Sequence, residues 1–73
     1  AHQLRPVMSN AVEIDYTNWR GERSRRRVLP LSWRFGSNEW HTTDQWLMTA
    51  HDLEKDAERE FAMSGIHSWR IAQ

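Results

Sequence analysis

Residues 44–64, with the sequence DQWLMTAHDLEKDAEREFAMS, decide whether this chain of 73 residues is mainly helical or mainly β. One interpretation is an amphipathic helix, because five apolar side chains recur at steps of three and four residues. They are Trp46, Ala50, Leu53, Ala57 and Phe61. Asp44 before this stripe and Gly65 after it are residue types that begin and end helices.

A β-hairpin is the rival interpretation of the same segment, because the side chains also alternate with a period of two. The alternating residues are Trp46, Met48 and Ala50 in one run and Arg59, Phe61 and Met63 in the next. The turn would span Glu54–Ala57, with Asp56 in the left-handed region. Only Thr49 in the segment is β-branched, so periodicity and propensity on their own favour the helix.

The chain upstream of this segment has a β pattern. Val12, Ile14 and Tyr16 alternate with polar residues, which predicts a half-buried strand. A turn bracketed by Asn18 and Gly21 follows, because both residue types tolerate a positive φ. Residues 1–11 show no period and are expected to be an N-terminal tail or irregular lead-in, with residues 12–73 as the single domain.

The second predicted strand runs from Glu22 to about Phe35 and ends at the loop signal of residues 36–38. Its apolar residues alternate, which predicts that they share one face: Leu29, Leu31, Trp33 and Phe35. Pro30 interrupts this run and is expected at an edge or a bend, since proline donates no ladder hydrogen bond.

Apolar residues are few, and the five tryptophans are therefore expected to supply much of the core. Leu, Ile, Val and Phe number 5, 3, 3 and 2, which is 13 of 73 residues. Large aromatic side chains bury on the order of 150–250 Å2 each. The predicted core tryptophans are Trp19, Trp33, Trp40, Trp46 and Trp69, with at most one or two left for binding.

The net charge of zero conceals two charged segments. Residues 20–34 hold six arginines against one glutamate, which gives +5, and residues 52–60 hold five acidic against two basic residues, which gives −3. On a strand, Arg23, Arg25 and Arg27 lie on one face and Arg26 on the other. Arginines beside Trp19 are typical of surfaces that bind phosphates and stack bases, so Arg20 to Arg27 are candidates for nucleic acid or another anion. The alternative is a solvated strand face, or one that pairs with the acidic segment.

Several functions are not expected. The chain has no cysteine, so a disulfide, a thiolate metal site and a cysteine nucleophile are excluded, and a reducing, cytoplasmic location is compatible with the composition. The four histidines share no metal-ligand spacing, and no motif positions a nucleophile or cradles a phosphate. We therefore expect no catalysis, no metal, no cofactor and no membrane span.

Several motifs together resemble the WYL-like domain family over about residues 12–69. The matching stretches are Ile14–Tyr16, Arg27–Pro30, Trp46–Ala50, Arg59–Phe61 and Gly65–Ile66. The motif residues are Arg27, Pro30, Trp46, Leu47, Met48, Arg59 and Phe61. Leu47, Met48 and Gly65 stand where the family has tyrosine, leucine and arginine, and residues 38–43 resemble an insertion.

The resemblance implies a mainly β fold and so favours the hairpin over the helix. The expected architecture is a small, strongly bent, SH3- or Sm-like barrel of about five antiparallel strands. In it, Trp46, Met48 and Ala50 would point inward, and Leu47 and Thr49 outward. A bacterial or phage source is also implied.

The function implied by the resemblance is a binding or regulatory module for nucleic acid or a nucleotide-like anion. The resemblance implies that Arg27 of the arginine strand and Arg59 would both line that site. In the alternative, Arg59 pairs with Glu13 or Asp15 instead. A protein-interaction adaptor or a homodimer, acting through an edge strand, an exposed tryptophan or the acidic segment, is the alternative function.

Overall fold

The ambiguous segment is a hairpin. The computed structural model describes residues 11–71, and residues 44–64 contain β3 (Gln45–Asp52), a turn at residues 53–56, and β4 (Ala57–Ala62). Asp56 has a φ of 53° in this turn, which is the left-handed conformation predicted for it. The helical stripe is therefore accidental, and the turn lies one residue earlier than expected. The other elements are β1 (Val12–Thr17), β2 (Arg23–Gly36), the 3-10 helix η2 (Met63–Gly65) and β5 (Ile66–Ile71).

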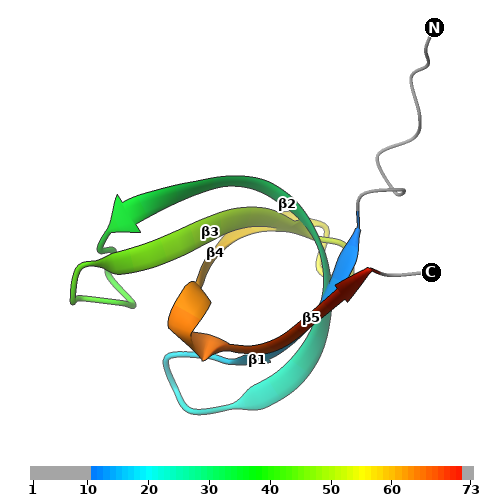
Figure 1. Cartoon of the computed structure of the whole chain (residues 1–73), viewed down its shortest axis with the longest axis horizontal. Coiled ribbons are helices and arrows are strands. Elements are labelled where there is room, and N and C mark those ends of the chain that lie inside the picture. Colours follow the sequence, from blue (N-terminus) through cyan, green and yellow to red (C-terminus); the bar gives the residue numbers. More distant parts are fainter. Residues whose placement is uncertain (1–10, 72–73) are drawn as a thin grey trace, which may run out of the picture.

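The five strands form one antiparallel sheet in the order β4-β3-β2-β1-β5. The sheet curls into a ring, and η2 leads the chain from β4 directly into β5 (Figure 1). Among residues 11–71, no ladder joins β4 to β5. The predicted mainly β fold is confirmed, and the barrel is open along this seam. Residues 1–10 of the predicted lead-in, which spans residues 1–11, and the last two residues of the predicted domain lie outside the described residues.

The long strand β2 bends where the sequence placed Pro30. Its register with β3 shifts between Pro30 and Ser32, so Leu31 is an extra residue in a bulge. Because one extra residue exchanges the two faces of a strand, Leu29 lies on the face opposite to Trp33 and Phe35. The prediction that these apolar residues share a face was wrong, since alternation cannot reveal a bulge.

The core lies inside the ring and is built from aliphatic side chains and two aromatic rings. Tyr16 and Phe61 meet edge to face, with ring centroids 4.9 Å apart. The cluster comprises Val12, Ile14, Tyr16, Val28, Met48, Ala50 and Phe61, with Met63 and Ile66 packed against it. Residues opposed on a ladder share one face of the sheet, and Met48 and Phe61 share the inner face.

The prediction of a tryptophan-rich core was wrong. All five tryptophans expose between 41% and 55% of their surface. Trp46 shares the inner face with Met48, as expected, but lies beyond the core, where it contacts Phe35. Leu47 points to the other face, as expected, yet it is fully buried. Its neighbour across the ladder, Arg34, pairs with Glu60 of β4, so that this ion pair spans β3 beside Leu47.

Candidate functional site

The arginine strand divides its side chains between two faces, as predicted. Arg23, Arg25 and Arg27 are exposed on the outer face, where they lie opposite Thr17, Asp15 and Glu13 of β1. Arg26 faces the interior and is only partly exposed. The strand therefore presents one exposed row of guanidiniums and sends a single guanidinium inward.

Acidic side chains of β1 neutralise part of the outer row. Arg23 donates from Nε and Nη2 to the two carboxylate oxygens of Asp15, at 3.0 and 2.9 Å. These hydrogen bonds lower the pKa of Asp15 below its ordinary value. Glu13 accepts a hydrogen bond from Arg70 of β5 at 3.2 Å, and this leaves Arg25 and Arg27 as the row members with no ion pair among residues 11–71. The outer face thus alternates in charge rather than forming a wholly basic pole.

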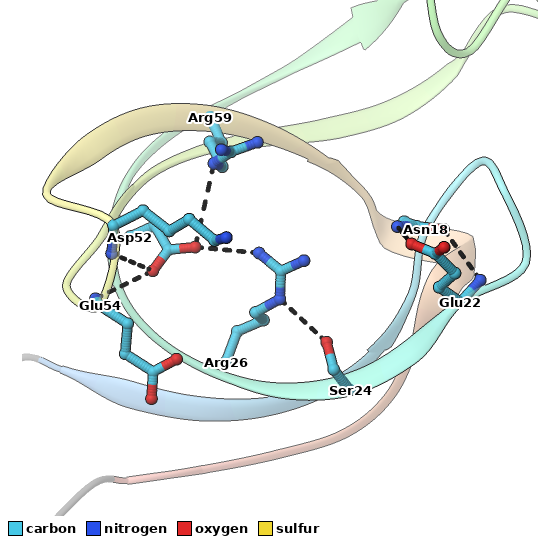
Figure 2. A network of polar contacts seen from close by, with 8 residues as sticks. Asn18, Glu22, Ser24, Arg26, Asp52, Glu54 and Arg59 are labelled. Carbon is cyan, nitrogen blue, oxygen red and sulfur yellow. Dashed lines mark hydrogen bonds and ion pairs between the residues drawn. The ribbon is translucent and has the colours of Figure 1, made fainter.

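Arg26 points into the ring and binds the carboxylate of Asp52, the one acidic side chain that is buried within residues 11–71. Its Nη1 donates to Oδ2 of Asp52 at 3.0 Å, and its Nε donates to the hydroxyl of Ser24 (Figure 2). The Nε of Arg59 lies 4.0 Å from the same Oδ2. The other oxygen of Asp52 accepts the N–H groups of Glu54 and Lys55 in the β3–β4 turn. One carboxylate therefore serves two guanidiniums and also fixes the turn.

The alternative in which Arg59 pairs with Glu13 or Asp15 was wrong, since these two carboxylates bind Arg70 and Arg23. The alternative in which the arginine segment pairs with the acidic segment is confirmed by the Arg26–Asp52 and Arg34–Glu60 ion pairs, although the sequence reasoning did not name these partners. The signal was available, because Arg26 faces inward whenever Arg25 and Arg27 face outward, and an inward arginine requires a buried acid.

A cleft of about 640 Å3 lies against the edge of β4. Three segments line it: the β1–β2 turn, the loop between β2 and β3, and five consecutive residues of β4. Two further lining residues, Tyr16 and Arg26, lie on the inner face of the sheet. A volume of this size is within the range of ligand sites, roughly 300–1,000 Å3.

Two tryptophans from different loops stack at this cleft. The rings of Trp19 and Trp40 have centroids 5.0 Å apart and an interplanar angle of 26°. The guanidinium of Arg20 lies 5.6 Å from the Trp19 ring centroid, in the range of a cation–π contact. Both tryptophans remain about half exposed, so the pair presents an aromatic surface beside a cation.

Two asparagines hold the loops that carry these tryptophans. The side-chain oxygen of Asn18 accepts the N–H groups of Arg20 and Glu22, and Gly21 completes the turn with a φ of 84°. The side-chain oxygen of Asn38 likewise accepts the N–H groups of Trp40 and His41. Asparagine suits this role because its side chain imitates a backbone turn. The aromatic pair is thus positioned by polar side chains and not by a packed core.

The cleft carries both signs of charge. Its basic lining residues are Arg20, Arg26 and Arg59, and its acidic ones are Glu39, Glu58 and Glu60. Glu60 accepts two hydrogen bonds from Arg34 and one from Asn38, and these lower its pKa. Glu39 and Glu58 form no ion pair among the described residues. Because the two signs of charge balance, the cleft suits a ligand that is held by directed hydrogen bonds and stacking. It is less suited to a ligand that is attracted only by net charge.

The predicted site residues fall on two separate surfaces. Arg20, Arg59 and Trp19 meet in the cleft, whereas Arg23, Arg25 and Arg27 lie on the outer face and do not line it. Of the motif residues, Arg59 and Phe61 also line the cleft. Trp40, which belongs to the apparent insertion, was not predicted as a binding residue, and only its contact with Trp19 assigns it to this site.

Comparisons with protein-family models, with curated proteins and with solved structures find no match to this chain. The resemblance to WYL-like domains therefore stays a prediction. Within residues 11–71, no three His, Asp or Glu side chains gather as a metal site. The same residues contain no helix of the length and apolar character needed to cross a membrane.

Proposed function

We propose that this protein is a non-enzymatic binding module for a nucleotide-like anion, taken up in the cleft beside β4. The observation that carries the proposal is the meeting of the Trp19–Trp40 stack with the guanidiniums of Arg26 and Arg59 on one cleft. A base or similar aromatic ring would stack on the tryptophans, and a phosphate would accept hydrogen bonds from the arginines.

The arginines retain unused donors. Arg26 uses Nη1 for Asp52 and Nε for Ser24, and Arg59 approaches Asp52 only at 4.0 Å. A guanidinium has five N–H donors, so both arginines can bind a phosphate without losing Asp52. The balanced charge of the lining favours a mononucleotide or the end of a single strand over a long duplex. The resemblance to WYL-like domains and the cysteine-free composition support a regulatory protein of the cytoplasm.

Fluorescence polarisation with a fluorescein-labelled tetranucleotide of DNA tests this function, with unlabelled mononucleotides as competitors. We expect Arg59→Ala to weaken binding by about tenfold or more, since hydrogen bonds to charged groups contribute roughly 1.5–3 kcal/mol. Trp40→Ala should weaken it as well. The matched control is Arg25→Ala, which removes an arginine from the outer face. If Arg25→Ala abolishes binding and Arg59→Ala does not, the ligand lies on the outer arginine row, and the cleft is the wrong site.

A protein-interaction module is the second candidate function. It is supported by three aromatic side chains at the β2–β3 hairpin, Trp33, Phe35 and Trp46, which each expose about half of their surface or more. Contiguous exposed apolar side chains are typical of interaction surfaces. A Trp46→Ser variant tests this function by sedimentation with a candidate partner, and unchanged complex formation would exclude the hairpin as the contact.

A further inference from the structure

The second edge of the sheet, β5, lies outside the cleft and has an open side. Among residues 11–71, β5 pairs with β1 and with no other strand. An open edge presents unpaired N–H and C=O groups, which can pair with a strand of another chain. Its sequence, IHSWRI, contains neither proline nor lysine, which often block such edges, but it does contain Arg70 and a bulge at His67, opposite the step from Asp15 to Tyr16.

Two apolar side chains lie beside this edge without cover. Trp69 lies opposite Ile14 and Ile71 lies opposite Val12, so both belong to the inner face of the sheet. Ile14 and Val12 are buried, whereas Trp69 and Ile71 are 41% and 68% exposed. The inner face therefore continues past the core and ends in apolar surface at the open edge.

The other edge, that of β4, is less accessible to a strand. Ala62 donates its N–H to the hydroxyl of Tyr16 at 3.1 Å, so this edge group already has a partner. The cleft residues of both loops flank the remainder of β4. A further strand is therefore expected at β5 and not at β4.

We propose that β5 pairs with β5 of a second copy of this chain, antiparallel and around a two-fold axis. A two-fold axis pairs β5 with an identical β5, so the two strands have the same length and the same alternation of side chains. A net charge of zero places no overall repulsion between two copies. Each copy would cover the Trp69 and Ile71 that the other leaves exposed, and the two sheets would join into one.

Symmetry and charge select the register. An axis perpendicular to the sheet preserves its faces, so one residue must oppose its own copy. Centring the pair on Arg70 would place two guanidiniums opposite each other, which is unfavourable. Centring it on Trp69 places the two indoles opposite each other on the apolar face and sets Arg70 opposite Ser68. The proposed register is therefore centred on Trp69.

Single cysteines test this register in an otherwise cysteine-free chain. Opposed residues of an antiparallel pair have Cα atoms about 4.5–5.5 Å apart, within the range that a disulfide spans. We expect Trp69→Cys to form a covalent dimer under mild oxidation, and Ser68→Cys, whose two copies would be displaced along the strands by two residues, to stay mostly monomeric. Efficient cross-linking of Ser68→Cys alone would overturn the register.

Light scattering of the unmodified chain tests the dimer itself. We expect twice the 8.8 kDa chain mass, and we expect Trp69→Lys to raise the dissociation constant by about tenfold or more, since lysine opposes edge pairing. Circular dichroism of Trp69→Lys verifies that the variant is folded. A monomer of the unmodified chain at every concentration up to the millimolar range, with neither cysteine variant cross-linking, would overturn the proposal.

Discussion

The guanidinium of Arg26 and the carboxylate of Asp52 form an ion pair of 3.0 Å inside the ring, between strands β2 and β3. Asp52 lies opposite Val28 on the ladder, so Arg26 reaches it diagonally along the inner face. A register slip of one residue would direct Arg27 inward and remove this partner. The ion pair therefore stabilises the observed register of β2 against β3.

Asp52→Asn is predicted to destabilise the fold strongly. The amide can still accept the N–H groups of Glu54 and Lys55, but Arg26 loses its charged partner in a largely buried place. Breaking a buried pair in this way costs about 3–5 kcal/mol of unfolding free energy, as measured by urea denaturation. Glu54→Gln, at an exposed position of the same turn, is the control and should change stability by less than about 0.5 kcal/mol. Equal effects of the two variants would contradict the structural role of the pair.

Tyr16 is predicted to titrate above its ordinary range in the folded protein. Burial raises its pKa above 10.0, because the phenolate is the charged form and the hydroxyl lies beside Ala62 in the interior. The chain has one tyrosine, so the phenolate absorbance near 295 nm reports this group alone. In denaturant the midpoint should return to the value of a free tyrosine.

The sign of the effect on stability follows from this raised pKa. The stabilising contribution is complete below the unfolded pKa and is lost as the pH rises through the folded one. Tyr16→Phe should remove the alkaline absorbance change. It should also leave the Ala62 N–H without an acceptor, which lowers the unfolding free energy by about 1–3 kcal/mol. Coincident midpoints in the folded and unfolded states would show that the hydroxyl is not buried.

Glu60 is predicted to contribute to acid sensitivity. The hydrogen bonds from Arg34 and Asn38 lower its folded pKa below the ordinary value of 4.5. Its contribution is therefore present above pH 4.5 and is lost as the pH falls through the lower folded pKa. Glu60→Gln should lower stability at neutral pH and flatten the decrease below pH 4.5, as measured by thermal unfolding. Glu39→Gln, which changes a carboxylate with no ion pair among the described residues, should leave that decrease intact.

Gly65→Ala is predicted to destabilise the junction between η2 and β5. A Cβ at this position would lie 2.5 Å from the carbonyl oxygen of Thr17 and 2.9 Å from a ring carbon of Tyr16. Overpacking of this kind typically costs about 1–3 kcal/mol, and a backbone oxygen has little freedom to move away. Gly21→Asn is the control, because the space around Gly21 is open and asparagine tolerates its positive φ. A similar melting temperature for Gly65→Ala and the unmodified chain would contradict this prediction.

Much of the fold could be predicted from local patterns. The alternation at Val12–Tyr16, the turn between Asn18 and Gly21, and the left-handed Asp56 all agree with the structure. Segment 44–64 was not assigned correctly by local patterns, because its apolar residues fit steps of three to four as well as steps of two, and its residue propensities favour the helix. Pairing with β2 favours the strand there, since β3 is a central strand with a neighbour on each side.

The candidate site was predicted only in part. The arginine cluster and Trp19 were identified as binding residues, but their division between the outer face and the cleft follows from the curl of the sheet. Trp40 lies 21 positions after Trp19, and stacking between two loops leaves no periodic signal in a sequence. The burial of Asp52 likewise depends on strands that are distant along the chain.

The sequence by itself determined β1, the first part of β2, the turn between them, and the faces of Arg23, Arg25, Arg26 and Arg27, because these depend on neighbouring residues and on the period of a pleated strand. Only the tertiary structure decided which tryptophans are exposed, where the bulge at Leu31 exchanges the faces of β2, and which acid each arginine binds. These outcomes depend on how the curled sheet brings together residues far apart in the chain. The physical reason is that burial and ion pairing are properties of the assembled surface, whereas periodicity and turn preference are properties of the local backbone.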